Sequence, residues 1–251
     1  MSNFQGKDVA AVILAAGMGK RMKSELPKVL HKLDGRFMVD YVIDKARAAG
    51  VKQIVLVVGH KHEMVEKELV DRQVKFALQM PQNGTGHAVQ MAVPYLGNFK
   101  GDLLVLCGDM PLVSVDTIQN LIKTRHESNA AAVVLTVNLD EPGSYGRIIR
   151  DNQGYLDSIV EFKDASESVK RIKEVNTGAY CFDYQMLLGV LNQLTAENAQ
   201  AELYLTDTIK LLKQKGLKVA ALVSDDSNEG FGINSIDELS YVESIIREQK
   251  Q

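Results

Sequence analysis

The 251-residue sequence lacks several features that would assign it to a special class of protein. No apolar run approaches the ~20 residues that a membrane span requires, and the first residues lack the apolar core of a secretory signal. Only two cysteines are present, Cys107 and Cys181, both in apolar stretches. We therefore expect a cytoplasmic protein with buried thiols rather than a disulfide framework, and no membrane partner.

The sequence also lacks a strong excess of charge of either sign. Its formal net charge is −3, which argues against a nucleic-acid partner, because such proteins usually rely on a general basic field. The charge does not argue against a small polyanion held by a few placed cations. With 45% hydrophobic and 24% charged residues, the composition is that of an ordinary globular chain, long enough for one large domain or two small ones.

Short apolar runs alternate with helical patterns in the first 140 residues. The runs predict strands at residues 9–17, 53–59, 74–78, 102–109 and 131–138. The helical patterns lie at residues 37–49, 62–70, 86–96 and 114–127, the last with Ser114 as its cap. Continuous apolar strands that alternate with helices indicate an α/β fold, in which a mostly parallel central sheet is covered by helices on both faces.

The pattern changes after residue 140. Residues 145–161 read as two strands joined by a turn at residues 152–154, which predicts a small antiparallel annex. Later segments predict strands at 175–183 and 217–223, and helices at 184–194, 203–215 and 236–249. No internal repeat or low-complexity segment is present.

A loop of small residues and glycines, LAAGMGKRM at residues 14–22, follows the first strand. Ligands of open α/β sheets bind beyond the carboxyl ends of the strands, and small residues let backbone N–H groups face phosphate oxygens. The loop is not a P-loop, because Arg21 follows Gly19 and Lys20. It is not a dinucleotide fingerprint, because Met22 replaces the third glycine. On the glycines alone, a plain turn with solvated cations is an equal alternative.

Together with LPKVL at residues 26–30, this loop resembles the signature of sugar-nucleotide pyrophosphorylases. The chain resembles the uridylyltransferase domain of bifunctional bacterial N-acetylglucosamine-1-phosphate uridylyltransferases, in the nucleotide-diphospho-sugar transferase family. Further family motifs follow in order over nearly the whole chain: Gln79, GTGHA (84–88), CGDMPL (107–112), YGR (145–147), Glu161 with KDA (163–165), NTG (176–178), YLTD (204–207) and GIN (232–234). The resemblance implies a Rossmann-like fold.

The resemblance also implies a function. One nucleotidyltransferase domain would span residues 1–251, with a nucleotide-binding part at about 1–140 and a sugar-binding part at about 141–234. It would transfer the uridylyl group of UTP to N-acetylglucosamine 1-phosphate, giving UDP-N-acetylglucosamine and pyrophosphate, with Mg²⁺ as cofactor. Because the sugar phosphate is already an anionic nucleophile, the protein has to supply cations, a metal and positioning rather than a general base.

The resemblance assigns roles to individual residues. Arg21 would hold the leaving phosphates and Lys28 the phosphoryl group in transfer, while Asp109 and Asn234 would bind the metal. Without the resemblance, Asp109 is equally well a turn residue, and Asn234 is better explained as one. The implied nucleotide-binding residues are Leu14, Ala15, Ala16, Gly17, Gln79, Gly84, Thr85, Cys107 and Gly108. The implied sugar-binding residues are Gly146, Glu161 and Asn176.

The sequence leaves other possibilities open. It shows no hexapeptide repeat, so we do not expect the β-helix acetyltransferase domain of the bifunctional enzymes or the trimer that this domain builds. The chain is then a stand-alone uridylyltransferase or a domain separated from a longer one. Alternative functions are a related nucleotidyltransferase that uses glucose 1-phosphate or another nucleotide, a non-catalytic nucleotide-sugar sensor, and a dinucleotide-dependent oxidoreductase, which Met22 disfavours.

Overall fold

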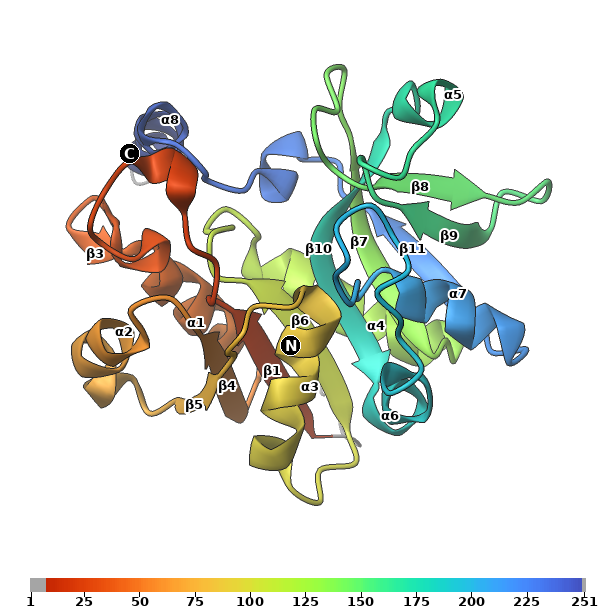
Figure 1. Cartoon of the computed structure of the whole chain (residues 1–251), viewed down its shortest axis with the longest axis horizontal. Helices are drawn as coiled ribbons and strands as arrows, with labels where there is room; N and C mark the ends of the chain where they lie inside the picture. Colours follow the sequence, from red (N-terminus) through yellow and green to blue (C-terminus); the bar gives the residue numbers. More distant parts are fainter. Residues whose placement is uncertain (1–7, 250–251) are drawn as a thin grey trace.

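The computed structural model describes residues 8–249. Its centre is a sheet whose main path runs through seven strands (Figure 1). In spatial order they are β11 (Val219–Val223), β7 (Ala132–Asn138), β10 (Glu174–Asp183), β6 (Asp102–Cys107), β1 (Val9–Leu14), β4 (Gln53–Val58) and β5 (Lys75–Leu78). The neighbours β6, β1, β4 and β5 are parallel, so their carboxyl ends meet at one edge. The predicted, mostly parallel sheet is confirmed.

Helices cover both faces of this sheet, as predicted. One face carries α3 (Thr85–Leu96), α6 (Tyr184–Leu191) and α7 (Asp207–Gln214), and the other carries α1 (Met38–Ala48), α2 (His62–Glu68) and α4 (Val115–Ser128). Alternate residues of β1 pack into the two layers: Ala10 and Val12 into one, Ala11 and Ile13 into the other. Burial on both faces explains the unbroken apolar run of this strand. None of the helices within residues 8–249 is long and apolar enough to cross a bilayer.

Strand β10 lies in a place that the sequence did not predict. Its residues were expected in the region of the antiparallel annex, but it lies in the main sheet, antiparallel to both β6 and β7. Its pairing with β7 shifts between Asn176 and Tyr180, around Gly178 with its positive φ of 88°. Asn176 therefore belongs to the main sheet and not to the annex. A continuous apolar run follows from burial on both faces, so an antiparallel strand in the middle of a covered sheet has the same pattern as a parallel one.

The predicted hairpin of the annex is confirmed by β8 (Arg147–Arg150) and β9 (Leu156–Val160), followed by the short α5 (Glu167–Lys170). Its turn closes with the Asp151 N–H donating to the Tyr155 carbonyl at 2.9 Å, and Gly154 has the positive φ that such a turn needs. Because Arg147 on β8 also pairs with Val175 on β10, the annex extends from the middle of the main sheet.

A third, smaller hydrophobic core lies between the last helix of the described chain and the segment around Leu33 and Met38. Helix α8 (Ile236–Glu248) packs against the short strand β2 (Lys32–Leu33), which pairs with β3 (Arg36–Phe37). Val242 and Ile246 of α8 share this core with Leu33, Met38 and Ile233, all buried. The remaining elements are 3₁₀ turns: η1 (Lys20–Met22), η2 (Lys28–Leu30), η3 (Val70–Arg72) and η4 (Ser227–Gly230). The small core therefore brings α8 beside the segment around Leu33.

Buried charges join α4 to the amino end of β6. The Arg125 guanidinium, near the end of α4, pairs with Asp102 and lies 3.7 Å from Asp183, while His126 Nε2 lies 2.6 Å from Asp102 Oδ2. Both Asp102 and Arg125 are buried. At the other end of α4, Ser114 Oγ accepts the Thr117 N–H at 3.1 Å, as predicted for its cap. Both ends of the helix are therefore held by polar contacts.

Replacing Arg125 by alanine should destabilise the fold, because it leaves Asp102 buried without its main cation. We expect the free energy of unfolding to fall by about 3–5 kcal/mol. Lys123→Ala on the same helix, which removes only the exposed 3.8 Å pair with Glu127, should lower it by less than about 1 kcal/mol. Urea unfolding followed by circular dichroism measures both changes, and equal losses would contradict the role given to the buried pair.

Candidate active site

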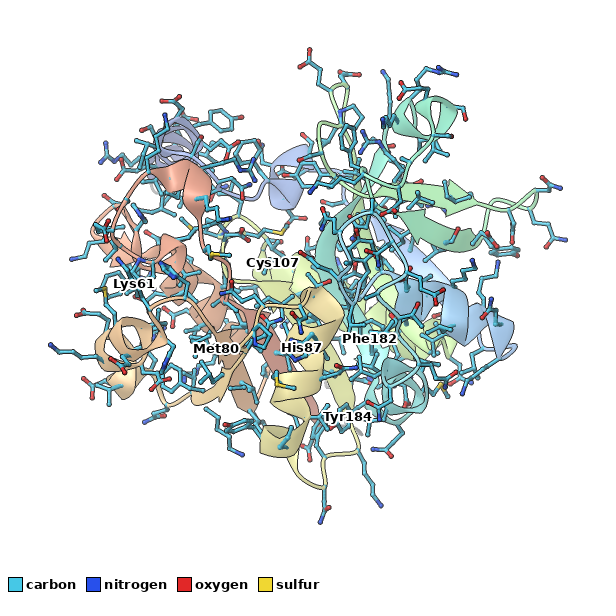
Figure 2. The ribbon with its side chains drawn as sticks, in the orientation of Figure 1. Lys61, Met80, His87, Cys107, Phe182 and Tyr184 are labelled. Carbon is cyan, nitrogen blue, oxygen red and sulfur yellow. The ribbon has the colours of Figure 1, made fainter. Side chains whose placement is uncertain are left out.

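A cleft of about 360 Å³ lies at the edge where β1, β5 and β6 end. Figure 2 shows the two ends of β6. Cys107 lies at its carboxyl end, and Tyr184, whose N–H donates to the Gly101 carbonyl, lies near its amino end. The cleft is lined by Leu14, Ala16, Gly17, Met18, Gln79, Gln82, Gly84, Thr85, Ala88, Cys107, Asp109 and Glu202. Most of the predicted nucleotide-binding residues are therefore brought together. Ala15 is buried next to this lining, and Gly108 donates its N–H to the Leu14 carbonyl at 2.9 Å.

Close backbone approach shapes the first loop. Gly19 has φ 59°, and a Cβ at this position would lie only 2.8 Å from Lys28 Cβ. Glycine therefore lets η1, which begins at the next residue, lie against the segment that carries Lys28. Arg21 on η1 is exposed, forms no ion pair with another described residue, and is not part of the cleft lining. It lies on a segment adjacent to the one that holds Lys28.

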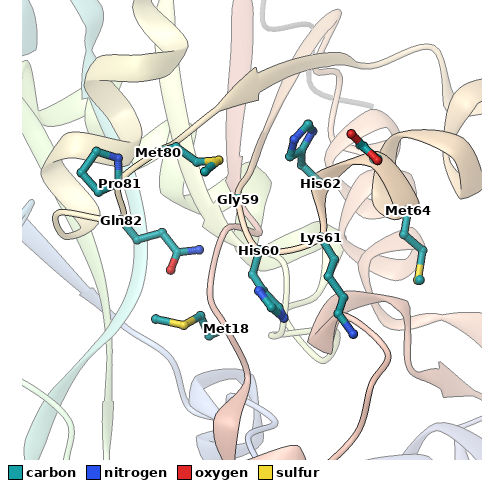
Figure 3. Close-up of a pocket in the computed structure, with 10 residues that line it drawn as sticks. Met18, Gly59, His60, Lys61, His62, Met64, Met80, Pro81 and Gln82 are labelled. Atoms are coloured by element: carbon teal, nitrogen blue, oxygen red, sulfur yellow. The ribbon is translucent and has the colours of Figure 1, made fainter.

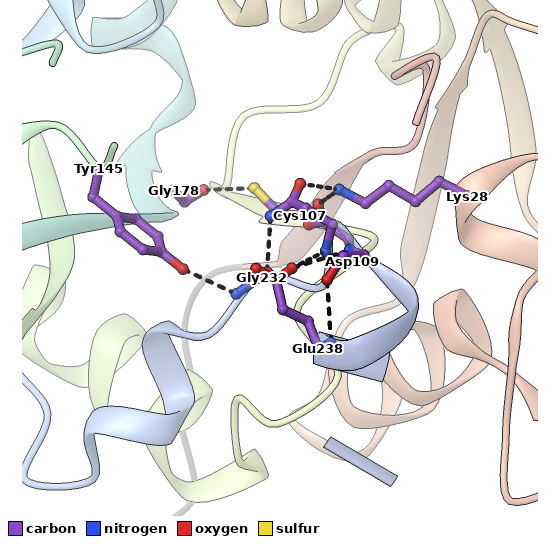
Figure 4. A network of polar contacts seen from close by, with 9 residues as sticks. Lys28, Cys107, Asp109, Tyr145, Gly178, Gly232 and Glu238 are labelled. Atoms are coloured by element: carbon purple, nitrogen blue, oxygen red, sulfur yellow. Dashed lines mark hydrogen bonds and ion pairs between the residues drawn. The ribbon is translucent and has the colours of Figure 1, made fainter. Parts of the chain in front are cut away.

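Three side chains that the sequence singled out meet at the mouth of this cleft. Lys28 Nζ donates to Asn234 Oδ1 at 2.6 Å and forms an ion pair with Asp109 (Figure 4). The side chains of Lys28 and Asp109 are only 12% and 24% exposed. A backbone hydrogen bond holds Asn234 close to Asp109, because the N–H of Ile233, the residue before Asn234, donates to the Asp109 carbonyl at 3.0 Å. The Asp109 carboxylate and the Asn234 amide oxygen thus both contact the Lys28 ammonium.

This arrangement suits a divalent cation that prefers oxygen. A carboxylate and an amide oxygen are hard ligands, and Mg²⁺ is usually bound by one or two protein groups with phosphates and water completing its shell. Within residues 8–249 no cluster of three His, Cys, Asp or Glu side chains could hold a metal ion by itself. Asp109 and Asn234 therefore fit a metal that is shared with a bound phosphate better than a closed structural site.

The loop after β5 forms one end of the cleft. Gln79 is 3% exposed, and its Nε2 donates to the Gly84 carbonyl at 2.8 Å. Gly84 has φ 100°, and an added Cβ would lie 2.6 Å from the Leu203 carbonyl oxygen. The Thr85 hydroxyl accepts the Leu205 N–H at 3.0 Å. This end of the cleft is thus held against the segment before α7 and presents a fixed amide side chain.

The residues predicted to contact a sugar also lie together. The Asn176 N–H donates to the Gly146 carbonyl at 2.9 Å, and a Cβ on Gly146 would lie 3.4 Å from Glu161 Oε2. Asn176 Nδ2 donates to the Tyr180 hydroxyl at 2.7 Å, and the Thr206 hydroxyl donates to Glu161 Oε1 at 3.1 Å. A carboxylate, an amide and two hydroxyls at one place form a polar group of the kind that binds sugar hydroxyls.

Burial controls the ionisation of Glu161. Desolvation raises its pKa, and the Thr206 hydrogen bond offsets part of this effect, while nearby carboxylates, Asp207 first, add to it. Tyr180 responds in the same way, because its burial, with the Glu161 charge nearby, raises its pKa well above 10. Both groups are therefore biased toward their neutral forms.

A larger hollow of about 760 Å³ adjoins the cleft and shares Met18 and Gln82 with it (Figure 3). The Gln82 amide donates to the Ala16 carbonyl between the two spaces. On the rim, Lys61 Nζ donates at 2.6 Å to both the backbone carbonyl and the carboxylate of Glu25. The amino end of α2 is therefore tied to the loop that links η1 to η2.

Residues 11–199 match the family described as the MobA-like NTP transferase domain. The chain belongs to this family. The match spans most of the main sheet and both layers of helices, from β1 through α6.

Two further proteins are similar to nearly the whole chain. "Bifunctional protein GlmU" of Caldanaerobacter subterraneus subsp. tengcongensis is 46% identical over 241 residues, 96% of this chain and 52% of the relative. The protein of the same name from Pelotomaculum thermopropionicum is 47% identical over 240 residues, with the same coverage. The chain spans about half the length of these relatives. The family resemblance predicted from the motifs is confirmed.

A solved structure shares the fold of this NTP transferase. The chain superposes on a crystal structure of UDP-glucose pyrophosphorylase complexed with UDP-glucose with a TM-score of 0.75, covering 97% of this chain and 100% of the other. Identity between the two is 14%, so the likeness concerns the fold alone. It confirms the predicted α/β architecture.

Several polar residues around the site were not singled out in the sequence. Tyr180 was hidden in an apolar strand pattern, and Gln82 lay in a loop without a helical or strand period. Thr206 belonged to a quoted motif but had no role. Tyr145 also belonged to a motif, and its hydroxyl accepts the Gly232 N–H at 3.2 Å (Figure 4), which links the annex to the loop of Asn234. Only tertiary contacts reveal that these residues lie at the site.

Replacing Gly84 by alanine should destabilise the NTP transferase through a steric clash. The added Cβ would meet the Leu203 carbonyl, and such overpacking costs about 1–3 kcal/mol beyond the backbone strain. Gly97→Ala is the matched control, because Gly97 also has positive φ, 59°, but a Cβ there meets nothing within 4 Å. Urea unfolding should show a larger loss for Gly84→Ala, and equal losses would contradict the clash.

The raised pKa of Glu161 predicts a pH-dependent cost of ionisation. Below about pH 4.5, the ordinary pKa of this side chain, folded and unfolded states are both protonated and no cost arises. As the pH rises from there through the raised folded pKa, the unfolded state releases its proton first, so stability is lost. Glu161→Gln should therefore be more stable than the unmodified chain at pH 8 and equal to it near pH 4. Urea unfolding at the two pH values measures this, and a pH-independent difference would contradict it.

Proposed function

We propose that this NTP transferase joins UTP and N-acetylglucosamine 1-phosphate to give UDP-N-acetylglucosamine and pyrophosphate. In this step a phosphate oxygen of the sugar phosphate forms a bond to the α-phosphorus of UTP. The bond from that phosphorus to the bridging oxygen breaks, and its electrons leave with pyrophosphate. The nucleophile is already an anion, so no side chain has to remove a proton.

The observation that carries this proposal is the contact of Lys28 with both Asp109 and Asn234 at the mouth of the cleft. It combines a cation with two oxygen ligands at the end of a parallel strand, which is the combination that phosphoryl transfer requires. Similarity to relatives named "Bifunctional protein GlmU", at 46% and 47% identity, supports the proposal.

Cations provide most of the catalysis in this proposal. Lys28 would contact the phosphoryl group in transfer, where its partly buried ammonium is poorly screened by water and therefore acts strongly. Arg21, exposed on the neighbouring turn, would bind the departing phosphates through its planar guanidinium, which suits bidentate contacts to phosphate oxygens. Together they would reduce the repulsion between the two anionic substrates and stabilise the charge that develops on pyrophosphate.

Asp109 and Asn234 would hold Mg²⁺, whose positive charge would neutralise the phosphates of bound UTP. A cation at these two oxygens competes with Lys28 for its present partners. Lys28 would then need another anionic partner, and the phosphoryl group of UTP is one. The exchange of partners follows from charge balance alone.

Base and sugar recognition would be divided along the chain, with the nucleotide bound mainly by residues 1–140 and the sugar by residues 141–234. The fixed Gln79 amide suits the imide edge of uracil, since an amide carries both donors and an acceptor. Gly146, Glu161 and Asn176 would contact the sugar. We propose the cytoplasm as the site of action, where the free thiols of Cys107 and Cys181 stay reduced.

Pyrophosphate release with a panel of substrates tests the proposal. UTP, dTTP, CTP and ATP would each be combined with N-acetylglucosamine 1-phosphate or glucose 1-phosphate, with and without Mg²⁺. We expect the highest kcat/KM for UTP with N-acetylglucosamine 1-phosphate, and turnover only with Mg²⁺. The proposal would be wrong if no pair released pyrophosphate. A different preferred pair would keep the reaction and change the substrate.

Variants of the cationic and metal-binding residues test the mechanism. Asp109→Ala and Arg21→Ala should each lower kcat/KM by about 100-fold or more, because the first removes a ligand of the Mg²⁺ that would neutralise the phosphates and the second removes a cation that would bind them. Lys20→Ala and Asp116→Ala, which remove exposed charges on nearby segments, are the matched controls and should stay close to the unmodified enzyme. Unchanged circular dichroism would show that the fold persists in all four variants.

A further inference from the structure

The side chain of Asn234 is held in one orientation at the proposed metal site. Its Nδ2 donates to the Gly232 carbonyl at 2.9 Å, and its Oδ1 accepts from Lys28 Nζ at 2.6 Å. The amide nitrogen of Asn234 already donates within its own loop. The amide oxygen is therefore the atom that faces the Lys28 ammonium, which also contacts Asp109. The position of this oxygen then depends on what holds the backbone of Asn234.

One carboxylate holds that backbone. Glu238, in the first turn of α8, accepts with Oε2 from the N–H of Asn234 and, at 3.1 Å, from the N–H of Ser235 (Figure 4). In return, Ser235 Oγ accepts the Glu238 N–H at 3.2 Å. The Glu238–Ser235 pair is a capping box, which requires only the bonds between these two residues. The bond to Asn234 goes beyond capping and attaches the proposed metal ligand directly to the helix.

The helix that carries Glu238 is itself anchored to the body of the protein. Its apolar residues Val242 and Ile246 are buried in the small core shared with β2. Glu243 Oε1 accepts the Asp34 N–H at 2.8 Å, so a second carboxylate of α8 holds a backbone N–H at another place. Glu238 therefore connects a firmly packed helix to a residue whose side chain reaches the active site.

We propose that Glu238 is a positioning residue for the nucleotidyl-transfer site: by holding the Asn234 backbone, it sets the Asn234 oxygen where it shares one cation with Asp109. The inference rests on the proposed function. Its physical basis is that groups behind a metal ligand fix the orientation of that ligand and so set the affinity for the metal.

Two substitutions of Glu238 separate position from charge. Glu238→Ala removes the acceptor for both N–H groups, whereas Glu238→Gln keeps an acceptor oxygen and loses the charge. Glu243→Ala is the matched control, because it also removes a carboxylate of α8 that accepts a backbone N–H, but away from Asn234. Urea unfolding of the three variants measures how much stability each loses.

Metal binding is the decisive measurement. The dissociation constant for Mn²⁺ in the presence of UTP would be measured from the spin-resonance signal of free Mn²⁺, and the Mg²⁺ concentration for half-maximal pyrophosphate release from kinetics. In Glu238→Ala both should rise by about tenfold, the usual effect of losing a group behind a metal ligand, with kcat at saturating Mg²⁺ less affected. Glu238→Gln should restore most of the loss, and Glu243→Ala should bind the metal like the unmodified chain.

Three results would overturn the inference while leaving the proposed function intact: unchanged metal constants in Glu238→Ala, an equal rise in Glu243→Ala, or a Glu238→Gln variant as weak as Glu238→Ala. An equal rise in Glu243→Ala would assign the weaker metal binding to a general loss of stability. A Glu238→Gln variant as weak as Glu238→Ala would assign it to the lost charge. An unmodified chain that neither binds Mn²⁺ with UTP nor releases pyrophosphate would overturn the proposed function and this inference together.

Discussion

The placement of the Lys28 ammonium between the Asp109 carboxylate and the Asn234 amide oxygen is the contact on which the site depends. A partly buried carboxylate is costly unless a cation or hydrogen-bond donors compensate its lost hydration. Lys28 supplies that compensation, so the site is charge-balanced before any ligand binds. A ligand that brings both an anion and a metal cation can exchange partners with these groups without leaving a charge unpaired. This is the physical reason why the arrangement suits a nucleoside triphosphate.

Most of the fold serves to bring these groups together. Asp109 follows the central strand β6, and Lys28 is placed by the close approach that Gly19 permits. Asn234 comes 206 positions after Lys28 in the chain and reaches the site because α8 packs on β2 in a core of its own. The annex contributes through the Tyr145 hydroxyl, which contacts the same loop at Gly232. Three separately packed parts of the molecule thus meet around the loop that carries Asn234.

Much of the fold and part of the site could be predicted from local patterns. The apolar runs of β1, β4, β5 and β6, which alternate with helices, indicated a parallel sheet, and the hairpin of β8 and β9 followed from its turn. The first loop and its glycines predicted a site beyond the carboxyl ends of the strands, and a cleft lies there. The position and direction of β10 were not predicted, because burial on both faces leaves the same pattern in a parallel and an antiparallel strand. Asn176 was consequently placed in the annex, although it lies in the main sheet.

The sequence by itself determined the local elements and the residue types available at each strand end, because hydrophobic period, turn residues and motif spacing act over short stretches of chain. Only the tertiary structure decided which of these residues share a partner. Lys28 and Asn234 show the difference: in the sequence they are two polar residues 206 positions apart, whereas in the folded chain the Lys28 ammonium donates to the Asn234 amide oxygen. Contacts of this kind depend on packing between distant segments, and no local pattern records them.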